Sequence, residues 1–490
     1  MEKTISKIKY IKNLLETKQV SCIELTNKYL ESIETENKIL NAYVKTTEEI
    51  AIATAKSVDD KISKREKLKP LEGIPMTLKD NISTKDVETT CCSRMLKGYI
   101  PIYDATVWSI LKGQNAVLLG KTNMDEFAMG SSCETSCFGG AINPHNSKYV
   151  AGGSSGGVAS AVGGNIAVYG LGSDTGGSIR QPASFCGLVG LKPTYGAISR
   201  YGLIAYASSL EQIGPIAKTV EDTALVYDSL SIYDTKDATS QGNKGQTAEG
   251  ILKNSIKGIK IGIVEEYFEG VRSDIKESIN DAIKVYEDLG AEIIHFKIPQ
   301  LKYSLPVYYI IACAEASSNL GRYDGIRYGY KSSSYDDIND MICKTRSGGF
   351  GKEVQRRILL GTYVLSAGYY DDYYKKAQKL RGSIVKAFRE AFDFCDVILA
   401  PTVPKTAFEL NYTSINPIET YMTDICTVAV NIAGLPAVSV PCGLDNKGLP
   451  IGMQIIGNIF DDAKILNVAY KYEQQSRNNI YKDIKMGVSL

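Results

Sequence analysis

The stretch from Gly152 to Gly190 constrains the fold more than any other part of this 490-residue chain. It is rich in glycine and serine, yet an apolar run at residues 166–171 divides it. A flexible Gly/Ser linker would lack such a run, because a linker buries nothing. We therefore expect a buried strand at the run. On either side lie two glycine-flanked serine clusters, residues 152–157 and 172–178, which we expect to form tight loops facing one pocket.

The two serine clusters have the composition of an acyl-transfer site. Glycine permits positive φ and close backbone approach, so several N–H groups can converge on one point. A hydroxyl beside converging donors supplies a nucleophile and an oxyanion hole. The alternative is that these glycines only form turns and close helix contacts. Two clusters in one short stretch favour the catalytic interpretation.

The choice of catalytic base is restricted, because the chain has only two histidines, His145 and His295. His145 lies in a polar loop and His295 in a strand-like alternation, so both are expected to be structural or surface residues. Residues 153–157 also fit the Gly-x-Ser-x-Gly nucleophile elbow, with Ser155 as nucleophile. That arrangement needs a downstream acid and histidine, and only His295 is available after Ser155. We therefore expect a base other than histidine.

Lys79 is a candidate for that base. It lies in a strand predicted over residues 73–83. A lysine at the end of a strand commonly extends its amine to solvent. If Lys79 is instead buried beside a serine cluster, desolvation lowers its pKa, and the neutral amine can accept a proton. Both possibilities remain open from these residues alone.

Overall composition excludes several classes of function. The chain has 56 basic and 55 acidic residues and a net charge of +1, so neither a nucleic-acid-binding nor a membrane-binding surface is indicated. No apolar run is long enough for a membrane span, and the amphipathic N-terminus lacks a secretory apolar core. We expect a cytoplasmic protein. Eleven cysteines without a signal sequence indicate reduced thiols. The pair Cys133 and Cys137 has no second cysteine pair or histidine cluster to complete a metal site, so no metal is predicted.

Alternating strand-like and helix-like segments predict an α/β fold, with a central mixed sheet covered by helices. We expect one large domain over residues 1–490: a helical cover (1–65), a core with both serine clusters (66–230), a polar surface excursion (231–257) and the remaining sheet and helices (258–490). Helices are predicted over residues 4–18, 21–35, 47–64, 105–113, 155–163, 273–289, 305–320, 352–392 and 461–477. Strands are predicted over residues 40–44, 73–83, 115–122, 166–171, 258–264, 291–298, 396–402, 437–443 and 452–457.

Residues 74–80, 152–157 and 172–180 together resemble the amidase signature family in composition and spacing. The resemblance implies a single α/β/α layered domain. It also implies that the serine after the second double glycine, Ser178, is the nucleophile. Ser154, on a cis peptide, and Lys79 would complete a Ser-cisSer-Lys triad.

The same resemblance supplies a reaction scheme. A neutral Lys79 would accept the proton of Ser178 through the hydroxyl of Ser154 and later return it to the leaving ammonia. Backbone N–H groups would form the oxyanion hole, at Thr175, Gly176, Gly177 and Ser178.

Residues 121–136, 315–329 and 356–370 are similar, within that family, to the A subunits of tRNA-dependent amidotransferases. This implies a glutaminase in a heterotrimer with B and C subunits, which passes ammonia to a partner that amidates mischarged tRNA. The glycine loops lack the Gly-Lys-Ser/Thr ending of a P-loop. We therefore expect no cofactor on this chain, ATP and Mg on the partner, and tRNA held mainly by the partner. Whether the tRNA carries glutamate or aspartate stays open.

Free glutamine makes its own demand on the pocket. Its α-carboxylate suits a guanidinium fork and its α-ammonium a carboxylate. The resemblance assigns these roles to Arg357 and Asp424, with Tyr309 nearby. Without the resemblance, Arg357 would be interpreted as an exposed helix arginine and Asp424 as a helix cap. The adjacent Tyr308 could face the pocket instead of Tyr309.

Two other functions remain as alternatives. A stand-alone amidase acting on another small or lipid amide would have no use for both Arg357 and Asp424. A scaffold that binds nucleic acid or partners would not need the intact set of Lys79, Ser154 and Ser178.

Overall fold

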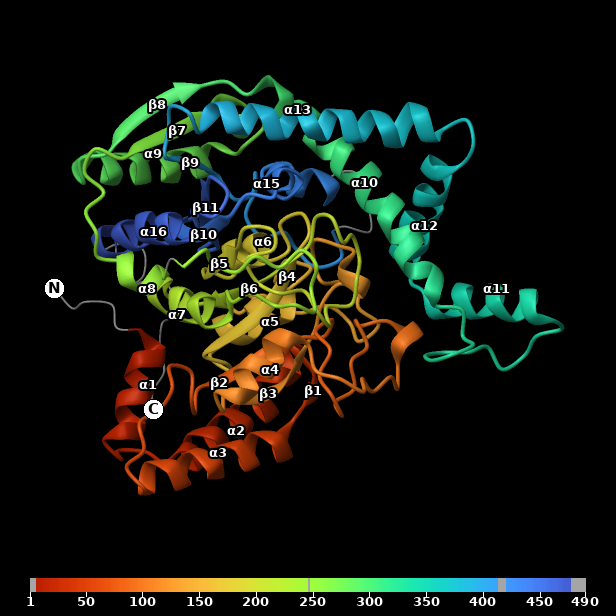
Figure 1. Cartoon of the computed structure of the whole chain (residues 1–490), viewed down its shortest axis with the longest axis horizontal. Helices are drawn as coiled ribbons and strands as arrows, with labels where there is room; N and C mark the ends of the chain where they lie inside the picture. Colours follow the sequence, from red (N-terminus) through yellow and green to blue (C-terminus); the bar gives the residue numbers. More distant parts are fainter. Residues whose placement is uncertain (1–5, 246, 413–419, 477–490) are drawn as a thin grey trace.

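A single mixed sheet of 11 strands runs through the molecule, in the order β1-β3-β2-β4-β6-β5-β10-β11-β9-β7-β8. The computed structural model describes residues 6–245, 247–412 and 420–476. Helices flank the sheet, with α1–α3 at one end and α13 near β7 and β8 at the other (Figure 1). The predicted α/β fold with a helix-covered mixed sheet is confirmed.

The strands are β1 (Tyr43–Thr46), β2 (Pro75–Lys79), β3 (Val117–Thr122), β4 (Tyr169–Asp174), β5 (Val189–Lys192), β6 (Gln212–Ala217), β7 (Lys260–Val264), β8 (Glu292–Phe296), β9 (Val397–Pro401), β10 (Ala437–Leu444) and β11 (Pro450–Gly457). The described helices are α1 (Lys7–Glu16), α2 (Cys22–Leu40), α3 (Glu48–Ser63), α4 (Thr106–Gly113), α5 (Gly156–Gly163), α6 (Arg180–Phe185), α7 (Val220–Leu230), α8 (Ala248–Ile251), α9 (Ser273–Asp288), α10 (Ser304–Asn319), α11 (Ile338–Gly349), α12 (Lys352–Leu365), α13 (Lys376–Ala391), α15 (Val428–Ala433) and α16 (Asp462–Ser476).

Three parallel strands at the centre of the N-terminal half position the site. β2 pairs in parallel with β3 on one side and β4 on the other. All three are buried along their whole length, and each carries polar residues at its carboxyl end. Because the carboxyl ends of parallel strands share one edge, Lys79 at the end of β2 and Asp174 at the end of β4 meet there.

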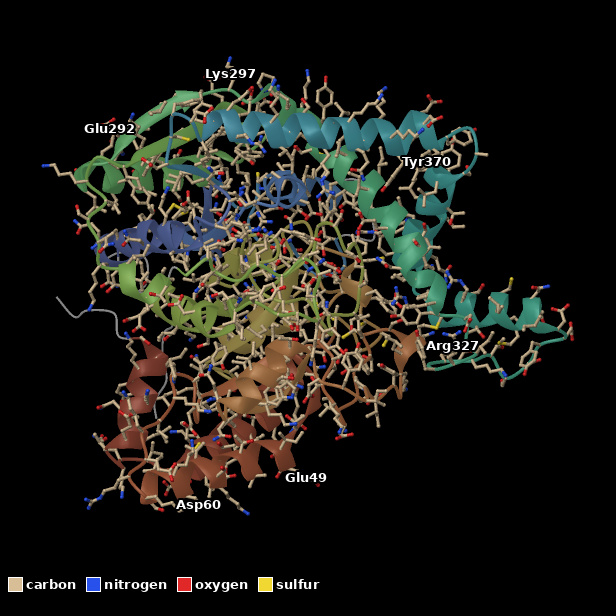
Figure 2. All side chains as sticks on the ribbon, viewed as in Figure 1. Glu49, Asp60, Glu292, Lys297, Arg327 and Tyr370 are labelled. Carbon is tan, nitrogen blue, oxygen red and sulfur yellow. The ribbon has the colours of Figure 1, made fainter. Side chains whose placement is uncertain are left out.

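The N-terminal helices follow from local sequence signals. Ser21 and Glu24 form the predicted capping box at the start of α2, each side chain accepting a backbone N–H of the other. α3 buries small apolar residues such as Ala51 and Ala55. Figure 2 shows Glu49 and Asp60 on its outer, exposed side. The two faces fix how this helix packs on the domain.

Most of residues 352–392 are helical as predicted, but the chain forms two helices there and not one. α12 ends at Leu365 and α13 begins at Lys376. Between them, Gly368 has a φ of +89° and a π-helical turn covers Tyr370–Lys375. Glycine tolerates this left-handed conformation, which interrupts the helix even though helical periodicity continues on both sides. Tyr370 marks the junction at the outer edge of the molecule (Figure 2).

The apolar run expected as a strand starts later and ends later than predicted. β4 begins at Tyr169 and continues into the second serine cluster as far as Asp174. The reason is an antiparallel partner, β6, whose residues Gln212 and Ile213 pair with Asp174 and Ser173. The elements absent from the predictions are β5, β6, α7, α8, α11 and α15, whose segments are short or lack a clear apolar period.

The proposed division of the domain into cover, core, excursion and remainder stays a prediction. Strands from residues 43–46, 75–217 and 260–457 all join the same sheet. None of the helices within the described ranges is both long and apolar enough to span a bilayer.

Candidate active site

Lys79 is buried among serine hydroxyls and does not extend to solvent. Its side chain has no exposed surface. Its Nζ donates to Ser154 Oγ at 2.6 Å, to Ser155 Oγ at 3.0 Å and to the carbonyl of Ser173 at 3.2 Å. Burial lowers the pKa of Lys79 to about 8, although nearby carboxylates such as Asp125 raise it in part. The neutral amine is therefore accessible near physiological pH, as a general base requires.

The first serine loop is fixed by two side chains that approach its backbone closely. The peptide between Gly153 and Ser154 is cis. The Gly153 N–H donates to Gln181 Oε1 at 2.8 Å. A Cβ on Gly153 would lie 1.9 Å from Asp125 Oδ2, so only glycine fits. Ser154 is consequently held with its hydroxyl directed at Lys79.

Ser178 is the most open of the serines in this cluster. It is 8% exposed, whereas Ser154 and Ser155 have no exposed surface. Its carbonyl accepts the N–H of Ser155 at 3.0 Å, which ties the two loops together. Within the described part of the chain, Ser178 Oγ makes no hydrogen bond to Ser154 Oγ or to any other group. Ser178 is therefore the serine that a bound substrate can reach.

Ser155 has no free capacity for the nucleophile-elbow role. Its Oγ accepts from Lys79 and from the N–H of Ser173, and it donates to the Ser173 carbonyl. His145 contacts the carbonyl of Cys186 through Nε2, and His295 is exposed on β8. Neither histidine adjoins the serine loops, so the elbow interpretation has no base.

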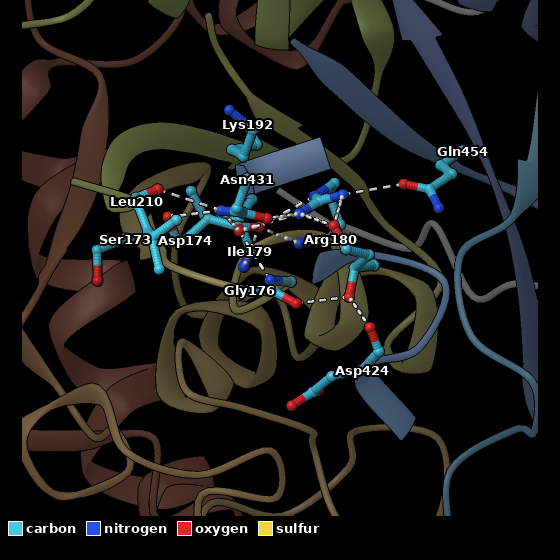
Figure 3. A network of polar contacts seen from close by, with 12 residues as sticks. Ser173, Asp174, Gly176, Ile179, Arg180, Lys192, Leu210, Asp424, Asn431 and Gln454 are labelled. Atoms are coloured by element: carbon cyan, nitrogen blue, oxygen red, sulfur yellow. Dashed lines mark hydrogen bonds and ion pairs between the residues drawn. The ribbon is translucent and has the colours of Figure 1, made fainter. Parts of the chain in front are cut away.

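A buried ion pair holds the second serine loop (Figure 3). Arg180 donates from Nε and Nη2 to both oxygens of Asp174, each at 3.1 Å. The guanidinium also reaches Gln454 Oε1 at 3.0 Å and Asn431 Oδ1 at 2.5 Å. Burial would raise the pKa of Asp174, but Arg180 outweighs it and holds that pKa well below its ordinary value. The carboxylate is thus ionised and anchors the loop.

Asp174 also decides which amides of the loop are free. It accepts the N–H of Gly177 at 2.8 Å, so this predicted oxyanion donor is already engaged. The N–H groups of Thr175, Gly176 and Ser178 make no hydrogen bond to the described residues. The Gly176 carbonyl, by contrast, accepts from Thr427 Oγ1 at 2.5 Å. Three of the four amides predicted for the oxyanion hole thus remain free for a ligand, and the oxyanion role itself stays a prediction.

A pocket of about 400 Å³ has Ser131, Ser132 and Arg357 among its lining residues, and Ser132 lies beside Gly153 of the first serine loop. Asp424 contacts the wall of this pocket, where it accepts from Tyr309 Oη at 2.9 Å and from Ser131 Oγ at 3.0 Å. Arg357 is 4% exposed and donates to Tyr206 Oη at 2.7 Å. A buried cation and a buried carboxylate thus lie in one site, as a zwitterionic substrate requires.

Burial raises the pKa of Asp424 to about 7, while its hydrogen bonds and Arg357 lower it in part.

Tyr308 and Tyr309 border the site at different points. Tyr309 donates to Asp424. The ring of Tyr308 packs against the second serine loop, since a Cβ on Gly176 would lie 2.6 Å from Tyr308 Cζ.

Sequence reasoning missed polar residues of this pocket, among them Ser131, Glu353 and Tyr421, and it missed Tyr206, which contacts Arg357 without lining the pocket. Glu353 lies four residues before Arg357 and pairs with it at 2.8 Å, so the i, i+4 spacing was an available signal. The other three come from distant segments and carry no such signal. No cluster of three or more His, Cys, Asp or Glu that could hold a metal occurs in the described ranges.

Comparisons with known proteins agree with this geometry. The amidase family model matches residues 24–466. The chain is 53% identical over 470 residues to the A subunit of glutamyl-tRNA(Gln) amidotransferase from Thermoanaerobacter pseudethanolicus, covering 96% of each chain. It is 54% identical to the corresponding A subunit from Caldanaerobacter subterraneus subsp. tengcongensis, covering 95% of each.

Solved structures extend the likeness. The A subunit of the Thermotoga maritima glutamyl-tRNA(Gln) amidotransferase superposes with a TM-score of 0.77 at 42% identity, over 91% of this chain and 92% of that one. A bacterial aryl acylamidase of the amidase signature family superposes with a TM-score of 0.84 at 26% identity, over 99% of each chain. The chain therefore belongs to the amidase family and, within it, to the glutamyl-tRNA(Gln) amidotransferase A subunits.

Proposed function

We propose that this chain is the glutaminase subunit of a tRNA-dependent amidotransferase and hydrolyses glutamine to glutamate and ammonia. The observation that carries the proposal is the direct connection between the serine loops and the ionic pocket. Thr427 Oγ1 contacts the carbonyls of both Gly176 and Asp424, at 2.5 and 3.0 Å. Gln181 joins the N–H of Gly153 to the carbonyl of Ser131. A molecule held by its charged end in the pocket would therefore present its amide to Ser178.

In the proposed reaction, Ser178 Oγ attacks the amide carbon of glutamine. Ser178 Oγ and Ser154 Oγ come into hydrogen-bond contact when substrate is bound, so the proton of Ser178 passes to Ser154, whose own proton passes to neutral Lys79. The N–H groups of Thr175, Gly176 and Ser178 stabilise the tetrahedral oxyanion; one such donor contributes about 3 kcal/mol to the transition state.

Collapse of that intermediate breaks the C–N bond. Lys79 returns its proton through Ser154 to the leaving nitrogen, which departs as ammonia and leaves a γ-glutamyl ester on Ser178. A water molecule then attacks the ester by the same proton path. Glutamate leaves and Ser178 regains its proton, so the enzyme is unchanged.

The other end of glutamine pairs with the buried charges of the pocket. Its α-carboxylate binds the guanidinium of Arg357, and its α-ammonium binds Asp424, beside Tyr309. An adjacent cation favours the ionised carboxylate, so binding lowers the raised pKa of Asp424. A substrate without these two charges would leave both groups buried and unpaired, which costs binding energy.

The ammonia serves a partner. We propose that B and C subunits complete a heterotrimer, that ATP and Mg bind the partner, and that this partner holds most of the tRNA. It would amidate Glu-tRNA(Gln), Asp-tRNA(Asn) or both, in the cytoplasm where aminoacyl-tRNA is used. The relatives support the first substrate, since they are named glutamyl-tRNA(Gln) amidotransferases.

Ammonia release from glutamine tests the proposal, with the chain assembled with its partner subunits. We expect Ser178→Ala to lower the rate by at least about 10³-fold, since the nucleophile is lost. Ser229→Ala is the matched control, because Ser229 Oγ only contacts the Leu225 carbonyl on α7. Full glutaminase activity in Ser178→Ala would refute the catalytic assignment. Turnover of unrelated amides without turnover of glutamine would favour a stand-alone amidase.

A further inference from the structure

Glu353 lines the pocket and contacts three of its neighbours at once. It lies one turn before Arg357 on α12. Its Oε1 accepts from Arg357 Nε at 2.8 Å and from Tyr421 Oη at 2.7 Å. Its Oε2 accepts from Nη1 of Arg356. The reaction scheme gives this carboxylate no role, yet its side chain is only 13% exposed.

These contacts fix the orientation of the Arg357 guanidinium. Nε is engaged by Glu353 and one N–H of Nη1 by Tyr206. Within the described residues, Nη2 makes no hydrogen bond. The end-on edge formed by Nη1 and Nη2 is therefore left for a ligand carboxylate, which prefers such a paired arrangement. Without Glu353, the edge of the guanidinium that contains Nε would be free to bind the ligand carboxylate instead.

Aromatic rings restrict the guanidinium further. Its Cζ lies 5.2 Å from the ring centre of Tyr309, 5.6 Å from that of Tyr421 and 5.8 Å from that of Tyr206. Tyr421 in turn packs on Tyr309, with ring centres 4.4 Å apart, and Tyr309 donates to Asp424. Glu353 thus reaches both charge-recognising groups, Arg357 directly and Asp424 through two tyrosines.

Charges of both signs surround the pocket. Three cations, Lys352, Arg356 and Arg357, and the carboxylate of Glu353 line it, and Asp424 contacts its wall. A zwitterionic ligand such as an amino acid can pair one of its charges with each sign, whereas a neutral amide gains nothing from the arrangement.

We propose that Glu353 is a positioning residue that makes the site selective for zwitterionic amino-acid amides, by orienting Arg357 and by holding Tyr421 in place. This inference rests on the proposed glutaminase function. It concerns the charged end of the substrate and leaves the chemistry at Ser178 untouched. Altering Glu353 should weaken the binding of glutamine, so KM should rise and kcat should stay nearly unchanged.

The test compares glutamine with butyramide, which lacks both charged groups, in the assembled complex. We expect Glu353→Gln to raise KM for glutamine about 10-fold to 100-fold and to change kcat by less than about threefold, since one charged hydrogen-bond partner of Arg357 is lost. Turnover of butyramide should stay within about twofold of the wild type. Glu390→Gln is the matched control, because Glu390 pairs only with the exposed Lys386 on α13.

Two further variants keep the inference open to refutation even if Glu353→Gln folds poorly. Tyr421→Phe removes only the hydroxyl bound to Glu353 and should raise KM for glutamine about threefold, without affecting butyramide. Glu353→Asp retains the charge and should restore part of the selectivity. Equal losses on both amides, or an unchanged KM for glutamine, would overturn the inference. A wild-type enzyme that did not prefer glutamine to butyramide would instead overturn the proposed function itself.

Discussion

Three lysines, Lys79, Lys121 and Lys192, are at most 1% exposed, and their partners distinguish them. Lys121 donates to the Ile82 carbonyl and to Thr89, beside Asp80, and Lys192 donates to the Pro193 carbonyl. Lys79 alone of the three contacts serine hydroxyls. At the scale of a residue, burial sets the pKa of an amine, and its neighbours decide whether the lowered pKa serves catalysis or only packing.

The proposed base predicts a specific pH dependence. The pKa of Lys79 is lowered from 10.5 to about 8, and only the neutral amine can accept the proton of Ser178 through Ser154. The rate must therefore fall as pH decreases through that value. We expect kcat for glutamine to rise about tenfold per pH unit well below pH 8 and to level off above it. A pH–rate profile of the assembled enzyme measures this.

Asp424 adds a second ionisation, visible only in the free enzyme. Its pKa is raised to about 7, and only the carboxylate attracts the substrate ammonium. kcat/KM should therefore fall more steeply than kcat as pH drops below 7, and Asp424→Asn should remove that extra steepness.

The assignment of Lys79 as the base has its own opposing outcome. A kcat that stayed constant from about pH 6 to pH 8 would contradict a lysine base.

The part of the site that could be found from sequence lies in two short stretches, residues 74–80 and 152–180. Lys79, Ser154 and Ser178 carry a local signature of glycines and strand ends, which reflects backbone constraints that neighbouring residues impose. Ser131 and Tyr421 carry no signature, because their position depends on how distant segments pack. The hydrogen bond from the Gly177 N–H to Asp174 could not be predicted from the sequence either, since it depends on the orientation of the Asp174 side chain.

At the scale of an element, the start of a helix was predicted well where an apolar face met a cap, as in α2 with Ser21 and Glu24, although α2 runs to Leu40, five residues beyond its predicted end. Helices were predicted poorly where tertiary contacts decided the end. α12 stops before the predicted helix does, at Leu365, where Ser366 is extended and Gly368 follows with a positive φ. It also lies unusually close to α10, because Gly361 presents no side chain: a Cβ there would lie 1.9 Å from the Cys313 carbonyl oxygen.

Gly361 is one helical turn beyond Arg357, so its contact with α10 also sets the position of the guanidinium. We expect Gly361→Ala to destabilise the protein by about 2 kcal/mol or more, because the backbone of α10 cannot move aside cheaply. KM for glutamine should rise as α12 shifts. Chemical denaturation and glutaminase kinetics measure the two effects.

Gly382 provides the matched control. It lies within α13, is exposed, and an added Cβ there meets nothing within 4 Å. Gly382→Ala should stabilise the protein by about 1 kcal/mol, since alanine loses less backbone entropy in a helix, and it should leave KM unchanged. If both alanines shifted stability in the same direction, the close packing of α10 and α12 could not be the reason.

At the scale of the whole molecule, the two halves of the chain supply separate blocks of the sheet. The strands β1 to β6 occupy one side and β7 to β11 the other, and the blocks meet at one seam, where β10 pairs with β5. The ion pair of Asp174 and Arg180 is likewise completed by late residues, Asn431 and Gln454. Neither half can satisfy its sheet edge or its buried charges alone.

This arrangement predicts that residues 1–257 and 258–490, produced separately, will not fold. The first fragment would expose the edge of β5 that β10 covers, and would bury Arg180 without its amide partners. We expect neither fragment to show a cooperative thermal transition or ordered near-UV circular dichroism. A single proteolytic cut near Lys244 of the folded chain is the control, since it leaves every strand in place. Fragments that stayed together and active after the cut, with isolated halves unfolded, would establish one folding unit over the whole chain. A cooperative transition in the isolated fragment 1–257 would show instead that the serine loops belong to a domain of their own.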